Sequence, residues 1–95
     1  MQAIVELGFL GRSFATRGKG AEVRQRLVRE ATDCEAVVDF TGVAYVSYSF
    51  ADEFIGRLAT EHPEIHLETV GLEGDVERVV RRVLARRNEL AASNC

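Results

Sequence analysis

The stretch VVDFTGVAYVSYSFADEF (residues 37–54) decides the fold, because an apolar run passes here, through a short polar segment, into the start of a helix. The apolar run at 35–40 predicts a short strand buried on both faces, as in parallel sheets. The residues at 49–62 predict a helix that ends at Pro63, which lacks the backbone N–H that a helix needs. Three side chains with hydroxyl groups separate the two elements: Ser47, Tyr48 and Ser49. Either they only cap the helix, or they form a site that a partner reads or modifies.

Five further segments complete the pattern. Apolar and β-branched residues at 3–11 predict a first strand, and 12–18 is expected to return as its hairpin partner. A helix is predicted at 18–33, a third core or edge strand at 64–72, and a long closing helix at 74–92. Two glycines are available for the hairpin turn: Gly8 and Gly11.

Apolar residues at three- and four-residue spacing define the buried side of each helix. In the middle helix they are Phe50, Phe54, Ile55 and Leu58, and in the last helix Val76, Val79, Val80, Val83 and Leu84. In the first helix, Arg24, Arg26 and Arg29 are expected to face solvent. Asp75 stands at the start of the last helix, where it can cap the helix and favour its dipole.

The order β(β)αβαβα predicts an α/β domain with a mixed, mostly parallel sheet of about four strands and three helices. The three helices must either cover mostly one face of the sheet or divide unevenly between its two faces. We expect one domain over 1–92 and a frayed end at 93–95.

Size and composition bound the function. Ninety-five residues, 46% of them hydrophobic, build one core and leave little room for a large enclosed active site, so no catalytic activity and no cofactor are expected. The net charge of −3 argues against nucleic-acid binding, and no apolar run is long enough to cross a membrane. The first residues lack the positive region of a signal peptide, and Cys34 and Cys95 form no disulfide framework, so we expect a cytoplasmic protein. Cys34 is expected to be at least half buried.

The residues from Ser49 to Asp52 fit a capping box, with Ser49 as the N-cap and Asp52 returning to its amide. Tyr48 is expected to be exposed, because the two phenylalanines of the helix already occupy the inward side. Together with Ser47 it would form a polar patch with an aromatic anchor, as found at interfaces. A phosphate here would be stabilised by the helix start, although a nearby Asp52 would repel it.

Asp39 ends a strand at the carboxyl edge of the sheet, where sites of α/β proteins gather. It could equally cap the turn at Thr41 through an Asx-type hydrogen bond. Both interpretations are open.

The glycine-rich segment TRGKG (16–20) matches neither a P-loop nor a dinucleotide fingerprint. It still offers cations and backbone amides at a helix start, which can bind an anion. An alternative function is therefore a small nucleotide- or anion-binding protein that uses Arg17, Gly18, Lys19 and Gly20.

The two histidines and the arginines of the last helix are not expected to form functional sites. His62 and His66 flank Pro63, so they cannot form a helical metal-binding pair, and no metal site is expected. Arginines of the last helix, which include Arg78, Arg81, Arg82, Arg86 and Arg87, are expected to form a solvated face paired with Glu77 and Glu89 rather than a basic patch.

The stretch VVDFTGVAYVSYSFADEFIGRL (37–58) resembles the STAS-like domain of unknown function, which is related to the STAS domain of bacterial anti-sigma factor antagonists. The SFADE run after DFTGV, with Thr16-Arg17 before the first helix, carries this resemblance. It implies a non-catalytic regulatory module that docks on a signalling partner. In anti-sigma factor antagonists that partner is a serine kinase of the histidine-kinase-like ATPase type, which phosphorylates a loop serine.

Aligned on DFTGV, the resemblance places Tyr48 at the phosphoacceptor position and Ser49 directly after it. Ser47 replaces an aspartate, and Phe50 and Asp52 replace glycines of that family. The residues expected to bind a partner or accept a phosphate are Ser47, Tyr48, Ser49, Asp52, Glu53, Asp39 and Thr41. Self-association into a homo-oligomer is compatible with this function.

Overall fold

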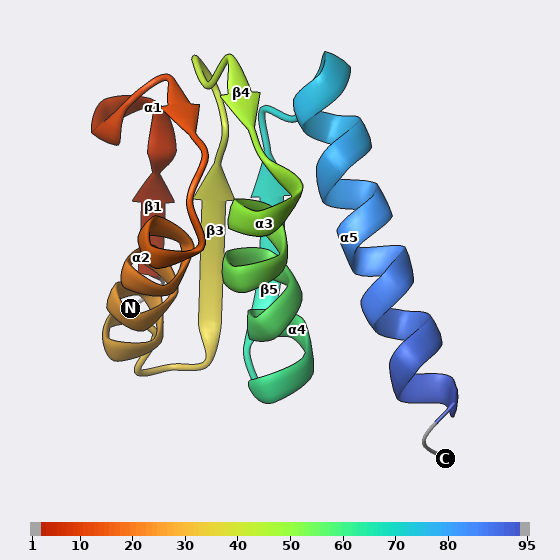
Figure 1. Ribbon diagram of the computed structural model, residues 1–95. Helices are drawn as coiled ribbons and strands as arrows, with labels where there is room; N and C mark the ends of the chain where they lie inside the picture. Colours follow the sequence, from red (N-terminus) through yellow and green to blue (C-terminus); the bar gives the residue numbers. More distant parts are fainter. Residues whose placement is uncertain (1–2, 94–95) are drawn as a thin grey trace.

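A three-stranded parallel sheet forms the centre of the structure, a computed structural model that describes residues 3–93 (Figure 1). Its strands are β1 (Ala3–Glu6), β3 (Glu35–Asp39) and β5 (His66–Val70), with β3 in the middle. Each crossover runs through a helix, as parallel strands require. The α/β class and the mostly parallel sheet predicted from the sequence are confirmed, but the sheet is not mixed, because every strand pair among residues 3–93 is parallel.

The predicted hairpin at the start of the chain is wrong. The first strand stops at Glu6, and a short helix, α1 (Leu7–Leu10), follows it directly. Gly8 lets α1 pack closely on the loop that follows β3, because a Cβ on it would stand 2.2 Å from the backbone oxygen of Thr41. The next strand, β2 (Ser13–Phe14), then pairs in parallel with β4 (Tyr45–Val46) in a separate two-stranded sheet.

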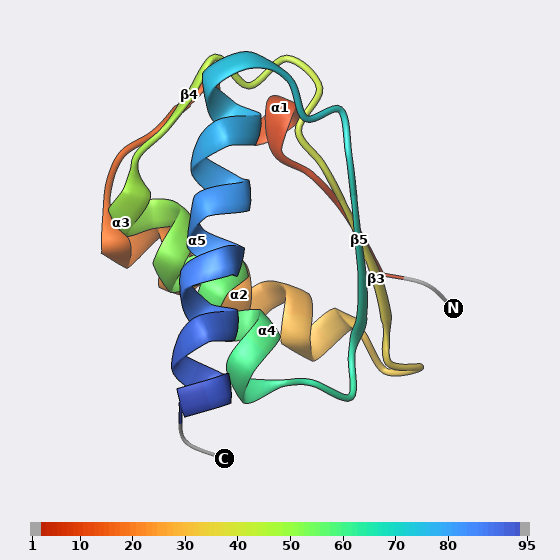
Figure 2. The same cartoon turned by 90° about the vertical axis from the view of Figure 1, so that its right-hand side faces the viewer.

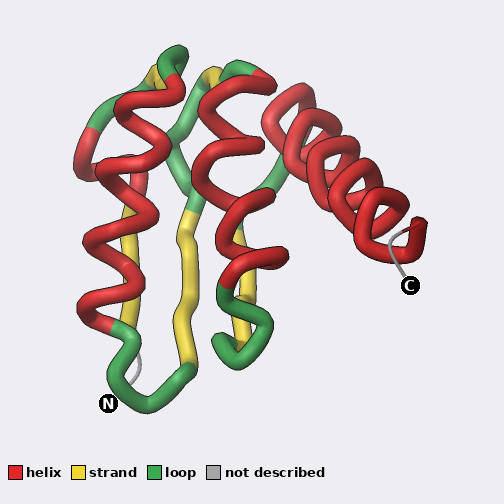
Figure 3. Tube along the Cα trace, turned by 60° about the horizontal axis from the view of Figure 1, so that its bottom comes forward, coloured by secondary structure: helices red, strands yellow, loops and turns green. Residues whose placement is uncertain are grey.

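Three helical segments form a layer over the sheet. They are α2 (Arg17–Glu30), the continuous run α3 (Tyr48–Ala51), η1 (Asp52–Gly56) and α4 (Arg57–Glu61), and α5 (Gly74–Ser93). The η1 segment is a stretch of π-helix. The run ends at Glu61, just before His62 and Pro63, as predicted. Figure 3 shows these helices side by side in front of the strands.

All of these helices lie on the same face of the three-stranded sheet (Figure 2). The core lies between the helices and that face. Its phenylalanine rings contact one another, Phe14 and Phe50 in a tilted pair with centroids 4.9 Å apart and Phe50 and Phe54 edge to face at 5.8 Å. The predicted stripe of the middle helix is fully buried, including Ile55 and Leu58. Of the last helix, Val76, Val80 and Val83 are buried, whereas Val79 and Leu84 are partly buried.

One-sided coverage corrects the burial predicted for the strand at 35–40. In β3 the side chains alternate between buried and partly or fully exposed, because no helix within residues 3–93 covers the second face. Val37 and Asp39 point to this uncovered side. The strand β5 forms an edge of the sheet.

Two single-residue expectations are also wrong. Arg24 is buried instead of facing solvent, and its guanidinium donates a hydrogen bond to the backbone oxygen of Glu53, which joins α2 to the middle helix. Cys34 is exposed, in a turn where its φ of 61° places it in the left-handed region.

The last helix continues through Ser93, the first residue of the predicted frayed end, and residues 94–95 lie outside the described part of the chain. Among residues 3–93, no helix combines the length and the apolar character that crossing a membrane requires.

Candidate functional site

The middle helix begins at the hydroxyl of Ser47, which caps it. Ser47 has an extended backbone, and its Oγ accepts a hydrogen bond from the amide of Phe50 at 2.9 Å. The same Oγ donates to the backbone oxygen of Ala15 at 2.8 Å, and the Ser47 amide donates to the oxygen of Phe14. Ser47 therefore fixes the helix start against the segment that leads into α2.

The capping box predicted for Ser49 is wrong, because the helix starts earlier. Ser49 lies inside α3, and Asp52 turns toward arginines of two other helices. Its carboxylate accepts from Arg87 Nε at 2.7 Å and Nη2 at 2.9 Å, and from Arg17 Nη1 at 3.3 Å. The hydrogen bond from Arg87 and, after it, that from Arg17 hold the pKa of Asp52 below its usual value.

Gly56 makes room for this ion pair. A Cβ on Gly56 would lie 2.9 Å from Asp52 Oδ1 and 3.1 Å from Arg87 Nε. Without a side chain at this position, α5 approaches the middle helix closely enough for Arg87 to reach the carboxylate.

Glu53 belongs to a second cluster on the same helix. Its carboxylate lies 3.0 Å from Arg57 Nη1, 3.7 Å from Arg24 Nη1 and 3.8 Å from Arg17 Nη1. The side chains of Asp52 and Glu53 are each only 15% exposed. Asp52 thus joins the middle helix to α2 and α5, and Glu53 joins it to α2, roles that the sequence pattern did not indicate.

The accessible part of the region is a hollow of about 580 Å³ between the start of α3 and α5. Tyr48, which is 40% exposed as predicted, lines it together with Arg82, Arg86 and the paired Asp52 and Arg87. Within the described residues, no carboxylate lies within ion-pair distance of Arg82 or Arg86. The hollow therefore combines an aromatic side chain with two available cations.

The sequence pattern did not single out Arg82 and Arg86 as site residues. It expected a solvated arginine face, and that holds for Arg81, which pairs with Glu77 at 3.1 Å, and for Arg78, which pairs with Asp75 at 2.9 Å. The four-residue spacing of Arg82 and Arg86 places them on one side of α5. Only the packing of α5 beside α3 shows that this side meets Tyr48.

Asp39 and Thr41 lie elsewhere. The Asp39 carboxylate accepts the Thr41 amide at 2.9 Å, which is the predicted Asx-type turn. Hydrogen bonds from the Thr41 side chain and amide lower the pKa of Asp39. Both residues line a separate hollow of about 300 Å³ with Glu6, Gly8 and Phe9.

The segment Arg17–Gly20 forms the first turn of α2, not a loop. Thr16 caps this turn by accepting the Lys19 amide at 3.1 Å, and the Lys19 ammonium lies 3.5 Å from Glu22. A Cβ on Gly20 would stand 2.7 Å from the backbone oxygen of Phe50, so this glycine serves the contact between α2 and α3. With Arg17 bound to Asp52, the cations of the predicted anion site already have partners.

The histidines are not brought together at this site. His62 lies 3.3 Å from Glu64, and His66 lies on β5. In residues 3–93, no group of three or more His, Cys, Asp or Glu side chains is arranged to hold a metal ion.

Comparison with known proteins places these elements in a family. Neither the curated proteins nor the solved structures that were compared with the chain gave a match. The family model of the STAS-like domain of unknown function matches residues 19–77, more than half of the chain, from the first turn of α2 to the first turn of α5. The matched segment includes β3, the Ser47 cap and the complete middle helix. The chain therefore belongs to the family of STAS-like domains of unknown function.

Proposed function

We propose that this protein is a non-catalytic regulatory module that docks on a signalling protein through the Tyr48 face, the surface formed by Tyr48, Ser49, Arg82 and Arg86. The observation that carries the proposal is the half-exposed tyrosine beside two arginines that have no ion-pair partner among the described residues. Tyrosine and arginine are the residue types that most often dominate the energy of protein interfaces.

The charge of the Tyr48 face favours an acidic partner surface. Asp52 borders the hollow, but Arg87 and Arg17 offset its charge, so Arg82 and Arg86 leave the face positive. Complementary charge on a partner speeds association and selects against basic competitors. By the resemblance to anti-sigma factor antagonists, we propose a histidine-kinase-like ATPase as the partner.

The same charges bear on regulation by phosphate. A phosphate on Tyr48 would lie near Arg82 and Arg86, which line the same hollow and can form charge-assisted hydrogen bonds with it. Repulsion by Asp52, expected from the sequence, is reduced because that carboxylate is bound to two guanidinium groups. The Ser47 hydroxyl is engaged by the helix cap, so Tyr48 and Ser49 are the better acceptors.

A non-catalytic role is in keeping with the state of the nearby acidic groups. The hydrogen bond from Arg87 lowers the pKa of Asp52, which moves this carboxylate further from the neutral range. A general acid or base needs a pKa near the working pH, which this arrangement opposes.

The test is a binding measurement with the histidine-kinase-like ATPase of the native host. Tyr48→Ala and the double variant Arg82→Glu/Arg86→Glu should each weaken binding at least about tenfold, as the loss of a main interface residue does. The matched control is Arg78→Glu/Arg81→Glu, which makes the same charge change on the same helix. If both double variants bind as the wild type does, the Tyr48 face is not the docking site. Intact-mass analysis of the protein from its host then shows whether Tyr48 or Ser49 carries phosphate.

A further inference from the structure

The uncovered side of the three-stranded sheet is a second candidate surface, independent of the Tyr48 face. Parallel sheets are nearly always covered by helices on both faces, yet here all of the described helices lie on one side (Figure 2). The side chains of the second face alternate along each strand with those of the core. We call this surface the open sheet face, and it consists of Ile4, Glu6, Glu35, Val37, Asp39, His66, Glu68 and Val70.

The strand register places these side chains in rows across the sheet. Ile4 aligns with Val37 and then with Glu68, and Glu6 aligns with Asp39 and then with Val70. Ile4 is 54% exposed and Val70 is 37% exposed, so apolar surface is accessible in two of the three strands. Phe9 of α1, which is 85% exposed, extends the apolar part beyond the carboxyl end of β1.

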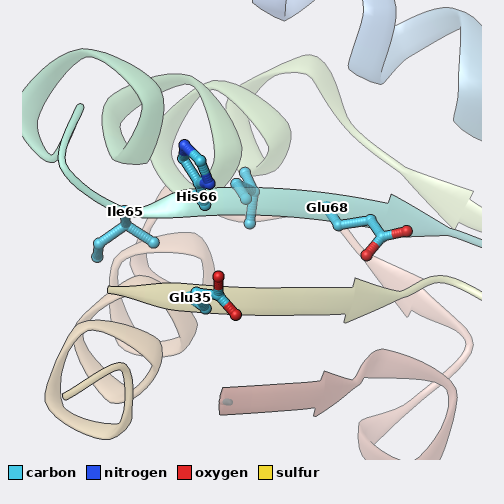
Figure 4. A pocket seen from close by; sticks show the side chains of 5 residues that line it. Glu35, Ile65, His66 and Glu68 are labelled. Carbon is cyan, nitrogen blue, oxygen red and sulfur yellow. The ribbon is translucent and has the colours of Figure 1, made fainter. Parts of the chain in front are cut away.

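The charge of the open sheet face has one sign. It carries four carboxylates, whereas all twelve lysines and arginines of the chain lie in α2, α4 and α5 or, for Arg12, before β2. Figure 4 shows Glu35 of β3 beside His66 and Glu68 of β5, where they line a hollow of about 420 Å³. At the other end of the strands, Glu6 and Asp39 line the hollow of about 300 Å³.

The size of the open sheet face fits one helix. Three strands about 4.8 Å apart, with four or five residues at about 3.3 Å each, cover roughly 15 by 15 Å. An α-helix with its side chains is about 10–12 Å wide and rises 1.5 Å per residue, so about ten residues of helix span the surface. This area is too small for a stable contact between two domains, which needs about 800 Å² on each partner.

From this shape and charge we infer that the open sheet face binds a short amphipathic helix of a partner protein, one that carries lysine or arginine around an apolar stripe. The apolar stripe would cover Ile4, Val37 and Val70, and the cations would meet the surrounding carboxylates. Binding would complete a layer of helix on each side of the sheet, the arrangement that parallel sheets normally have. The proposal does not depend on the Tyr48 face.

The test uses a synthetic helical peptide with leucine at three- and four-residue spacing and lysine at the other positions. It should bind the wild-type chain, and the affinity should fall with added salt because exposed charges are screened. A peptide with glutamate in place of lysine, and one with serine in place of leucine, should bind at least about tenfold more weakly.

Two double variants locate the binding surface. Glu6→Lys/Glu68→Lys reverses two charges of the open sheet face and should weaken binding of the lysine–leucine peptide at least about tenfold. Glu22→Lys/Glu30→Lys makes the same change in net charge on α2 and should bind like the wild type. Equal affinity of the two double variants would overturn the proposal, because the attraction would then depend on net charge alone.

Methyl NMR of the wild-type chain gives a readout that needs no variant. Addition of the peptide should shift the signals of Ile4, Val37 and Val70 and leave those of the buried helix valines in place. Shifts confined to the helix layer would contradict the proposal. Sedimentation tests the alternative that a second copy of the chain occupies the open sheet face. If the wild type self-associates, and if Glu6→Lys/Glu68→Lys abolishes this while the α2 control does not, the proposal of a partner helix is wrong.

Discussion

Replacement of Ser47 by alanine tests where the middle helix begins. The substitution removes the acceptor of the Phe50 amide and the donor to the oxygen of Ala15, which are hydrogen bonds of 2.9 and 2.8 Å. Loss of a serine N-cap costs about 0.5–2 kcal/mol, and loss of a typical second hydrogen bond costs about 0.5–1.5 kcal/mol. Because Ser47 is only half buried, water replaces part of the loss, so we expect a decrease of about 1–2.5 kcal/mol in the free energy of unfolding.

The assay is urea denaturation followed by far-UV circular dichroism, with Ser49→Ala as the matched control. The decrease for Ser47→Ala corresponds to a melting temperature roughly 4–20 °C lower, since about 1 kcal/mol shifts a domain of this size by 4–8 °C. The slope against urea should stay unchanged, because the same surface is exposed on unfolding. Ser49→Ala should change the stability by less than about 0.5 kcal/mol, as is usual away from such features.

Ser47→Thr provides a rescue, because threonine retains the hydroxyl and is a competent N-cap. If Ser49→Ala is as destabilising as Ser47→Ala, the cap lies at Ser49 and the structural argument about the helix start is wrong. The same argument would fail if Ser47→Ala had no measurable effect on the free energy of unfolding.

Three further substitutions probe the contacts around the helices. Asp52→Asn should lower the stability by about 1–2 kcal/mol at pH 7, since hydrogen bonds between charged groups are lost. The folded-state pKa of Asp52 is lowered, so the stability that its carboxylate contributes is present above about pH 4 and is lost as the pH falls through the folded pKa. In urea titrations, the difference in free energy of unfolding between wild type and variant should therefore be smaller at pH 3 than at pH 7. Gly20→Ala should destabilise the chain, because the new Cβ would meet a backbone oxygen of α3. Gly18→Ala should be neutral or stabilising by up to about 1 kcal/mol, because nothing lies within 4 Å of the new Cβ. Equal melting temperatures of the two variants would contradict this. Thr41→Val should raise the pKa of Asp39 toward its ordinary value, and an unchanged NMR titration of that carboxylate would show that the Thr41 hydroxyl is not its partner.

The two surfaces differ in the way that they could serve a signalling module. The Tyr48 face is basic and aromatic, and the open sheet face is acidic and apolar. Because they lie on opposite sides of the three-stranded sheet, one molecule could hold an acidic and a basic partner at the same time (Figure 2). Such an arrangement would let a phosphate on the Tyr48 face change one contact and leave the other intact.

Local pattern was a good guide to the elements. The apolar spacing of the middle helix placed Phe50, Phe54 and Leu58 in the core, and Pro63 marked its end, because side-chain periodicity and backbone chemistry act within a few residues. The same kind of pattern failed for the first hairpin. A run of apolar residues does not show whether the strand that follows it becomes its hairpin partner or pairs with a distant strand. Here β2 pairs with β4, where Phe14 aligns with Val46.

The sequence by itself determined the class of the fold, the order of the strands β1, β3 and β5 and of the three long helical segments, the helix stripes and the family resemblance at residues 37–58. Only the tertiary structure decided which serine caps α3, that Asp52 binds Arg87 and not its own helix start, that Tyr48 meets Arg82 and Arg86, and that one face of the sheet is left uncovered. The physical reason is separation along the chain. The ion pairs of Asp52 join residues 35 positions away on either side, and no local preference of the backbone specifies which helix will lie within reach of a carboxylate.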